Sequence, residues 1–179
     1  MSNNPADGSP SVHVTPTSHP TIQRHYATSF HNCFGCGPNN ASGLQLRCWV
    51  EGDDAVARWT PLPHLEGPAR ALHGGITALL MDEVGSAAAF MEFHRRQGST
   101  PGEAPAPFFV TATLSVDYLK PVPIDRELEL RAHTTNPQDV ASRKAWIKGV
   151  LTREGEVAAT ARLLFILTDA EKYDDAHTA

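Results

Sequence analysis

The longest regular hydrophobic pattern in the chain starts at Gly74 and ends near His94. Apolar side chains recur there every three or four residues, as they do along one side of an α-helix. They are Ile76, Leu79, Leu80, Val84, Ala87, Ala88 and Met91. The run ends at Arg95 and Arg96, cations that suit the negative end of a helix dipole. The pattern predicts one long helix that begins at a pair of glycines.

Shorter stretches before and after this helix alternate between apolar and polar residues, which is typical of strands. The predicted strands are 44–50, 55–60, 108–119, 126–134, 142–152 and 157–167. Tight turns at 51–54 and 153–156 join two pairs of them, and the proline-containing segments 61–70 and 97–107 are predicted to be loops. Hairpins around one helix that is apolar on most sides predict an α+β fold. In it, an antiparallel sheet of about six strands wraps around the central helix.

The two ends of the chain lack this patterning. Residues 1–26 are rich in Ser, Thr, Pro, His and Asn, and we expect a disordered N-terminal arm there. The folded domain is predicted to occupy 27–168, followed by a flexible tail at 169–179.

Composition and charge indicate where in the cell this domain is located and which partners it lacks. The 179 residues carry 20 acidic and 15 basic side chains, a net charge of −5 that argues against a nucleic-acid partner. We find no apolar run long enough to span a bilayer and no secretory signal pattern. The three cysteines, an odd number, do not form a disulfide framework. We therefore expect a cytoplasmic protein with neither membrane nor nucleic-acid partners.

Two adjacent carboxylates, Asp82 and Glu83, interrupt the apolar helix. A carboxylate on a buried helix is costly unless it is paired or has a task. At 100° per residue, small residues share the face of Asp82: Gly75, Ala78, Ser86 and Ala89. Bulkier residues share the face of Glu83: Ile76, Leu80, Ala87 and Met91. We therefore expect Asp82 to face space for a substrate and Glu83 to press against the sheet.

Four motifs together resemble the PaaI-type branch of the hotdog-fold thioesterases over roughly residues 31–167. They are Cys33-Phe34-Gly35-Cys36-Gly37-Pro38, Gly43-Leu44, His73-Gly74-Gly75 and Asp82-Glu83. The resemblance implies hydrolysis of acyl-CoA thioesters to a free carboxylic acid and CoA, with no cofactor and no metal. It also implies a homodimer, or a homotetramer built as a dimer of dimers, with active sites at the subunit interface.

The resemblance assigns a role to each part of the helix motif. Asp82 would act as general base on water or as nucleophile, and these two routes stay open. The amide of Gly75 would bind the thioester oxygen, while Gly74 would help the backbone to turn. His73 would orient the substrate carbonyl or fix the preceding loop. Glu83 is a reserve catalytic candidate, since some related thioesterases use a glutamate on this helix, or else a structural acid.

Further residues are candidates for substrate contact. By resemblance, Thr111 would reach the active site of the partner subunit and position water there, although a hydroxyl is also an ordinary strand residue. The acyl group, whose nature, aryl or aliphatic, stays open, should lie along the helix near small residues such as Ser86 and near Phe90 or Phe93. Arg143 and Lys144 at the start of a strand could meet the phosphates of CoA.

Cys33 and Cys36 form a CxxC motif. Such a motif can be half of a zinc site, here completed by Cys48 and His31, or a redox pair. We favour a third interpretation, in which the loop packs near the active site and the cysteines are small buried residues.

Two other functions fit the same fold. One is a non-enzymatic acyl-CoA-binding sensor, against which the presence of Asp82 argues. The other is an acyl-thioester hydratase or dehydratase. Those sites pair a histidine with a carboxylate in a different arrangement, whereas His73 here precedes the helix.

Overall fold

The structure is a computed structural model that describes residues 18–68, 70–103, 105–135 and 141–169. Its strands are β1 (Trp49–Glu51), β2 (Asp54–Trp59), β3 (Phe108–Tyr118), β4 (Leu128–Thr134), β5 (Lys144–Arg153) and β6 (Glu156–Thr168). A single long helix, α1 (Gly74–Gln97), lies between β2 and β3 in the chain. Three short 3-10 helices are η1 (Ile22–His25), η2 (Thr28–Phe30) and η3 (Pro63–Leu65).

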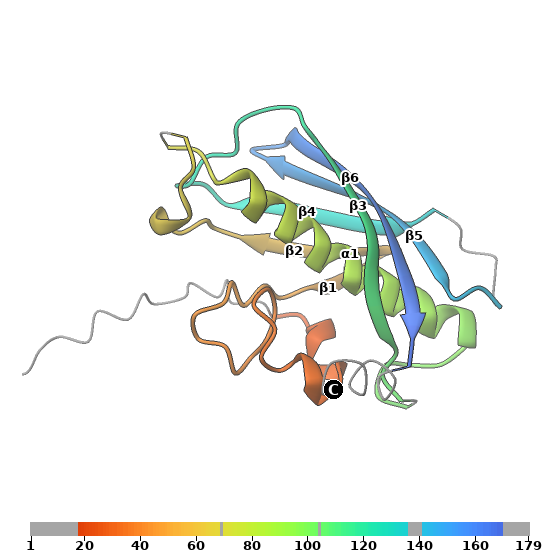
Figure 1. Ribbon diagram of the computed structural model, residues 1–179. Coiled ribbons are helices and arrows are strands. Elements are labelled where there is room, and N and C mark those ends of the chain that lie inside the picture. The colour runs from red at the N-terminus through yellow and green to blue at the C-terminus, as the bar shows by residue number, and fades with distance from the viewer. Residues whose placement is uncertain (1–17, 69, 104, 136–140, 170–179) are drawn as a thin grey trace, which may run out of the picture.

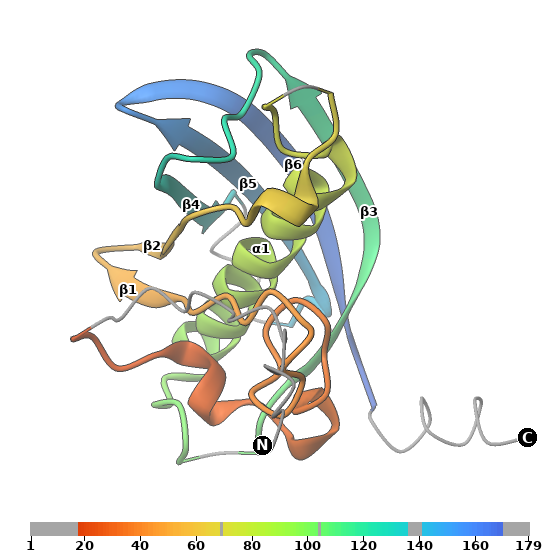
Figure 2. The ribbon, with the colours of Figure 1, turned by 90° about the vertical axis from the view of Figure 1, so that its left-hand side faces the viewer.

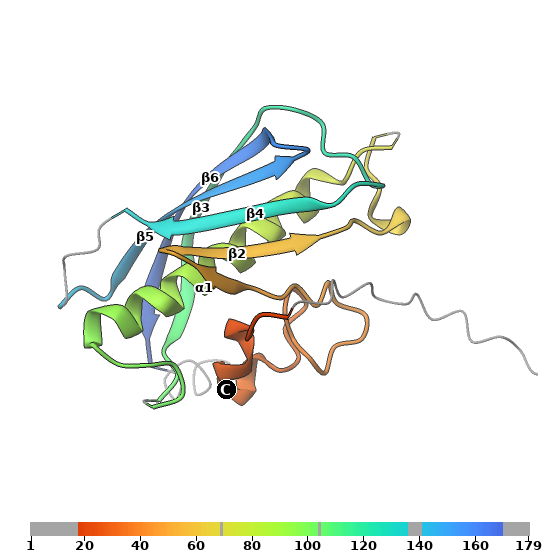
Figure 3. The same cartoon turned by 180° about the vertical axis from the view of Figure 1, so that it is seen from behind.

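The six strands form one sheet in the order β1-β2-β4-β5-β6-β3, and every neighbouring pair is antiparallel. The sheet curves around α1, which lies along its concave side (Figure 1). Figure 3 shows the same arrangement from behind, with the strands in front of the helix. The predicted antiparallel sheet around one central helix is confirmed.

Local sequence accounts for where these elements start and stop. Between β5 and β6, Glu154 and Gly155 both have positive φ, 48° and 80°, which is the backbone of a two-residue hairpin turn. Gly98 caps the C-terminus of α1: its φ of 61° is left-handed, and its N–H bonds back to the carbonyls of Arg95 and His94. The last helical residue, Gln97, lies one residue beyond the predicted C-terminal cations His94-Arg95-Arg96.

The face of α1 that meets the sheet carries small and apolar residues. A Cβ added to Gly85 would lie 3.0 Å from Leu163 and 3.1 Å from Phe165 of β6, so the helix approaches the sheet closely there. Leu80 and Val84 are fully buried. Burying such a side chain contributes about 1.5–3 kcal/mol. This packing fixes the rotation of α1, and with it the direction in which Asp82 and Glu83 point.

The first predicted strand is mostly wrong. Only Trp49–Glu51 pairs with β2, because the preceding backbone pairs with the loop before it instead. Leu44 N–H donates to the Phe34 carbonyl at 2.8 Å, and Leu46 N–H donates to the Gly35 carbonyl at 2.8 Å. Alternation of apolar residues indicates that one face of a segment is buried. It does not indicate which other segment the backbone of that segment pairs with.

Part of the segment expected to be a disordered arm is folded. Ile22 is buried, and its N–H donates to the Cys48 carbonyl at 2.7 Å. The ring of His19 stacks on Trp49 at 5.5 Å. The boundary predicted at 26 is therefore too late by at least eight residues, since 19–26 belong to the fold. Residues 1–17 and 170–179 lie outside the described residues, so the rest of the arm and the tail stay expectations.

The segment 18–48 covers the side of α1 that the sheet leaves open (Figure 2). Tyr26 packs on Phe90 of the helix with ring centroids 5.0 Å apart. Phe30 packs on Phe108 of β3 at 4.9 Å. These contacts hold the loop Cys33–Gly37 against the middle of the helix.

Candidate active site

Asp82 lies in the middle of α1, partly buried, and faces strand β3. Thr111 Oγ1 donates a hydrogen bond to Asp82 Oδ1 at 2.8 Å. Burial raises the pKa of Asp82 above its ordinary value, the hydrogen bond from Thr111 lowers it, and the charge of Cys33 raises it. Within the described residues no Lys or Arg forms an ion pair with this carboxylate. Asp82 is thus a partly buried carboxylate that the hydroxyl of Thr111 orients, while no basic side chain of the described residues compensates its charge.

A bulge in β3 aims Thr111 at the helix. The register with β6 shifts between Thr111 and Thr113, which leaves an extra residue in β3. A bulge moves the alternation of side chains by one residue. Thr111 therefore shares the helix-facing side with Leu114 and Val116, which pack against the core. The resemblance implied that Thr111 serves the partner subunit's site, whereas the structure brings it to Asp82 of its own chain.

The amides of the two glycines at the N-terminus of α1 differ in their hydrogen bonding. His73 is the N-cap residue, and its Nδ1 accepts a hydrogen bond from Gly75 N–H at 3.0 Å. The amide expected to bind the thioester oxygen is therefore already occupied. The N–H of Gly74 has no hydrogen-bond partner among the described residues. The Gly74 carbonyl accepts from Tyr118 Oη at 2.9 Å, so β3 also holds this end of the helix.

Within one chain, the Gly74 amide and the Asp82 carboxylate are too far apart to contact the same substrate carbonyl. Gly74 and Asp82 are eight residues apart, which is about 12 Å along the axis of an α-helix. Contacts to a reacting carbonyl are about 3 Å long. A substrate bound at Asp82 therefore lies beyond the reach of the Gly74 amide of the same helix.

Glu83 faces the cysteine loop, so the expectation that it presses against the sheet is wrong. Its side chain is only 7% exposed, and Glu83 Oε1 lies 3.4 Å from Cys33 Sγ. Gly35 has no room for a Cβ because the Glu83 carboxylate occupies that space. Burial, and then the charge of Cys33, raises the pKa of Glu83. Helical phasing separated Glu83 from Asp82, but it gave no sign of a loop 50 residues earlier in the chain.

The loop cysteines differ in their surroundings. The pKa of Cys33 is lowered, first by a hydrogen bond from the Cys36 side chain and also by the N–H groups of Cys36 and Gly35. Hydrogen bonding to Cys33 and burial raise the pKa of Cys36. The sequence offered the CxxC spacing as a signal for this loop, but no signal for its contact with Glu83.

Two of the predicted substrate residues come together. Ser86, one turn after Asp82, and Phe90 line a narrow pocket. Its remaining lining residues are Tyr26, Phe30, Pro107 and Phe109. The pocket is mostly aromatic, but its volume is only about 10 Å³, so these side chains pack closely and their contact with an acyl group stays a prediction.

Arg143 and Lys144 lie elsewhere, beside the C-terminal end of α1. Arg143 donates to the Leu167 carbonyl at 2.9 and 2.7 Å. The Lys144 carbonyl accepts from Arg96, which is 14 residues, or about 21 Å, along the helix from Asp82. Their contact with CoA phosphates stays a prediction.

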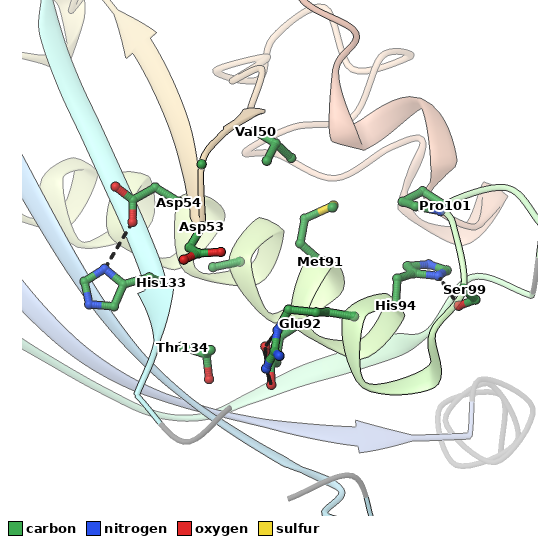
Figure 4. Close-up of a pocket in the computed structure, with 13 residues that line it drawn as sticks. Val50, Asp53, Asp54, Met91, Glu92, His94, Ser99, Pro101, His133 and Thr134 are labelled. Atoms are coloured by element: carbon green, nitrogen blue, oxygen red, sulfur yellow. Dashed lines mark hydrogen bonds and ion pairs between the residues drawn. The ribbon is translucent and has the colours of Figure 1, made fainter. Parts of the chain in front are cut away.

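A cavity of about 620 Å³ also lies toward the C-terminal half of α1 (Figure 4). Met91, Glu92 and His94 line it from the helix. Asp54 of β2 and His133 of β4, 3.2 Å apart, line it from the sheet. Asp82 and Thr111 are not among its lining residues, so this cavity is separate from the face that carries Asp82.

No helix among the described residues has both the length and the apolar character needed to cross a membrane. A comparison with curated proteins found no significant match. The family model of the thioesterase superfamily matches residues 70–137, which include α1, β3 and β4.

Solved structures of similar fold agree with this match. A thioesterase superfamily protein from Shewanella loihica PV-4 is 25% identical, with a TM-score of 0.55 over 74% of this chain and 98% of its own. A putative thioesterase from Ralstonia eutropha JMP134, named as related to phenylacetic acid degradation, is 15% identical, with a TM-score of 0.58 over 83% and 100%.

A third similar structure is a mutant of the phenylacetic acid degradation protein PaaI from Thermus thermophilus. It is 18% identical, with a TM-score of 0.54 over 69% of this chain and 93% of its own. The fold, the family match and these neighbours agree with the resemblance seen in the motifs: the chain has the hotdog fold, and its residues 70–137 match the thioesterase superfamily model.

Proposed function

We propose that the protein hydrolyses acyl-CoA thioesters to a free carboxylic acid and CoA. The observation that carries this proposal is the environment of Asp82, a partly buried carboxylate held by Thr111 at 2.8 Å. Small residues, Ala78 and Ser86, share its face of the helix, and we propose that the substrate lies against them. The match of residues 70–137 to the thioesterase superfamily model supports the reaction class.

Asp82 supplies the base or the nucleophile. In the first route its carboxylate takes a proton from water while the water oxygen attacks the thioester carbonyl. In the second route the carboxylate attacks directly and forms an anhydride, which water then hydrolyses. Both routes break the C–S bond, and the CoA sulfur leaves as thiolate and takes up a proton. Since burial raises the pKa of Asp82, the group is a stronger base than an exposed aspartate.

The carbonyl oxygen gains negative charge in either route, and the amide of Gly74 is the donor that we assign to it. This amide lies at the positive end of the α1 dipole, and His73 Nδ1 holds the neighbouring Gly75 amide away from the substrate. One such donor contributes about 3 kcal/mol to transition-state binding in other enzymes.

The distance of about 12 Å between Gly74 and Asp82 along one helix requires a second chain. We propose that Asp82 and Thr111 of one subunit face the helix N-terminus of its partner, in a homodimer or a dimer of dimers. Two active sites then form at each interface.

A panel of acyl-CoA thioesters with detection of the released thiol tests the reaction. Aryl-acetyl thioesters come first, because two similar structures are named for phenylacetic acid degradation, and aliphatic thioesters of increasing length follow. We expect turnover of at least one class and its loss in Asp82→Asn. Binding of acyl-CoA without turnover of any thioester would instead identify a sensor.

A further inference from the structure

The contact between Glu83 and the cysteine loop forms a compact cluster of three ligand atoms. Cys33 Sγ, Cys36 Sγ and a Glu83 carboxylate oxygen all lie within 4.8 Å of one another. We propose that these three side chains bind one zinc ion and leave its fourth coordination position open. The site lies beside the catalytic face and does not depend on the proposed hydrolase activity.

The donor set selects the metal. Zinc takes thiolate, imidazole and carboxylate ligands at about 2.0–2.3 Å in a tetrahedron, which places neighbouring ligand atoms about 3.3–3.8 Å apart. The 3.4 Å between Cys33 Sγ and Glu83 Oε1 is already of this size. Two thiolates disfavour magnesium and calcium, which prefer oxygen ligands.

The backbone holds the two cysteines in place without a metal. Gly37 N–H donates to the Cys33 carbonyl at 2.9 Å and closes the turn. A Cβ at Gly37 would lie 2.5 Å from Cys33 N and from the His31 carbonyl oxygen, so only glycine fits there. The hydrogen bonds from Leu44 and Leu46 fasten the same loop on its other side. The loop therefore presents both sulfur atoms to Glu83 in a fixed arrangement.

No basic side chain of the described residues forms an ion pair with the cluster; the guanidinium of Arg47 donates instead to the backbone carbonyl of Cys36 at 2.7 Å. Glu92, the other buried glutamate of α1, forms ion pairs with Arg95 and Arg96 at 2.7 and 2.6 Å. Glu83 is similarly buried, yet no Lys or Arg of the described chain forms an ion pair with it. Three acidic groups converge there instead. A divalent cation supplies the charge that the arginines supply to Glu92.

The third cysteine provides a matched control. Cys48 is fully buried, as a zinc ligand would be, but its sulfur is outside the three-atom cluster. Its backbone N–H is held by Gln23 Oε1 at 2.9 Å. The zinc site that sequence alone suggested, with Cys48 and His31, is thus replaced by one completed by Glu83.

Metal analysis of the full chain, purified from zinc-supplemented cultures under reducing conditions, tests the site. We expect a single zinc ion per chain in the wild type and in Cys48→Ser. Cys33→Ser, Cys36→Ser and Glu83→Gln should each lower the zinc content or affinity by about tenfold or more. Circular dichroism checks that each variant is folded.

A second measurement needs no variant. Cobalt(II) added to the metal-free wild type should produce the charge-transfer absorption of thiolate–cobalt bonds, and zinc should displace it. Three results would overturn the proposal: free, titratable Cys33 and Cys36 thiols with neither metal bound; a Cys33–Cys36 disulfide in the protein as isolated; or equal loss of zinc in Cys48→Ser.

Discussion

The two halves of helix α1 bury carboxylates in opposite ways. In the C-terminal half, Glu92 is 4% exposed and pairs with two arginines, one of which, Arg96, also donates to the carbonyls of Ser142 and Lys144. In the N-terminal half, Asp82 and Glu83 are also withdrawn from water. Their neighbours are a hydroxyl and two thiols, not basic side chains.

This difference distinguishes a structural acid, Glu92, from the two acids for which we propose a function. Glu92 joins the end of the helix to β5, and its charge is compensated within the fold. Asp82 and Glu83 keep their capacity to interact with something that is not part of the chain. Burial alone therefore does not identify a catalytic carboxylate, but burial without a compensating cation is a useful sign of one.

The largest effect is expected at Asp82. Asp82→Asn removes the proposed base or nucleophile, and kcat/KM for the best acyl-CoA substrate should fall by about a thousandfold. The free energy of unfolding in urea should change little, because no ion pair of the described chain is broken. An Asp82→Asn enzyme that retains most of its activity would mean that another group, with Glu83 the first candidate, does the chemistry.

Glu92→Gln should show the reverse behaviour. It removes the negative charge that pairs with Arg95 and Arg96, and the side chain of Arg96 is itself only 5% exposed. We expect the free energy of unfolding to fall by about 3 kcal/mol, measured with urea. The kcat/KM of the folded fraction should stay within about threefold of the wild type. If Glu92→Gln lost much of its activity and none of its stability, Glu92 could not be contrasted with Asp82 and Glu83 as a structural acid.

At the helix N-terminus, Gly74→Pro deletes a single N–H. Proline is tolerated at the first position of a helix, and the ψ of 133° at His73 suits a residue that precedes proline. We expect kcat to fall about a hundredfold, as for loss of one oxyanion donor.

Gly74→Ala is the matched control, because it keeps the amide and places its Cβ at an ordinary 3.6 Å from Tyr118. It should retain activity within a few fold. If Gly74→Pro is as active as Gly74→Ala, the oxyanion donor lies elsewhere, and Gly75 again becomes the candidate.

The smallest effect is expected at Thr111. Thr111→Val removes the hydrogen bond that orients Asp82 and lowers its pKa, so kcat/KM should fall by about tenfold. The base acts in its ionised form, and loss of this bond raises its pKa further. The acidic limb of the pH–rate profile should therefore move to higher pH. Thr113→Val, beyond the bulge on the other side of β3, should leave that limb in place.

The parts of the fold that follow from local pattern were predictable. The 3.6-residue repeat from Ile76 to Met91 identified the central helix, and alternation identified most strands. The strand expected at 44–50 failed because Leu44 and Leu46 bond to the loop Cys33–Gly37. That pairing depends on loop geometry, which hydrophobic alternation does not encode.

The site was predictable only where one helix determines it. Phasing separated Asp82 from Glu83, and the motif spacing pointed to the helix N-terminus. The bulge that turns Thr111 toward Asp82 and the contact of Glu83 with Cys33 both join distant segments. The choice of Gly74 over Gly75 depends on one histidine rotamer. None of these three features leaves a periodic signal in the chain.

Mixing two inactive variants tests the central claim most directly, namely that Asp82 of one chain acts with Gly74 of another. Asp82→Asn and Gly74→Pro chains, unfolded and refolded together in equal amounts, should form mixed dimers with one intact site each. Random pairing then restores about a quarter of wild-type acyl-CoA hydrolysis. A mixture no more active than the two variants measured separately would contradict a site shared between subunits.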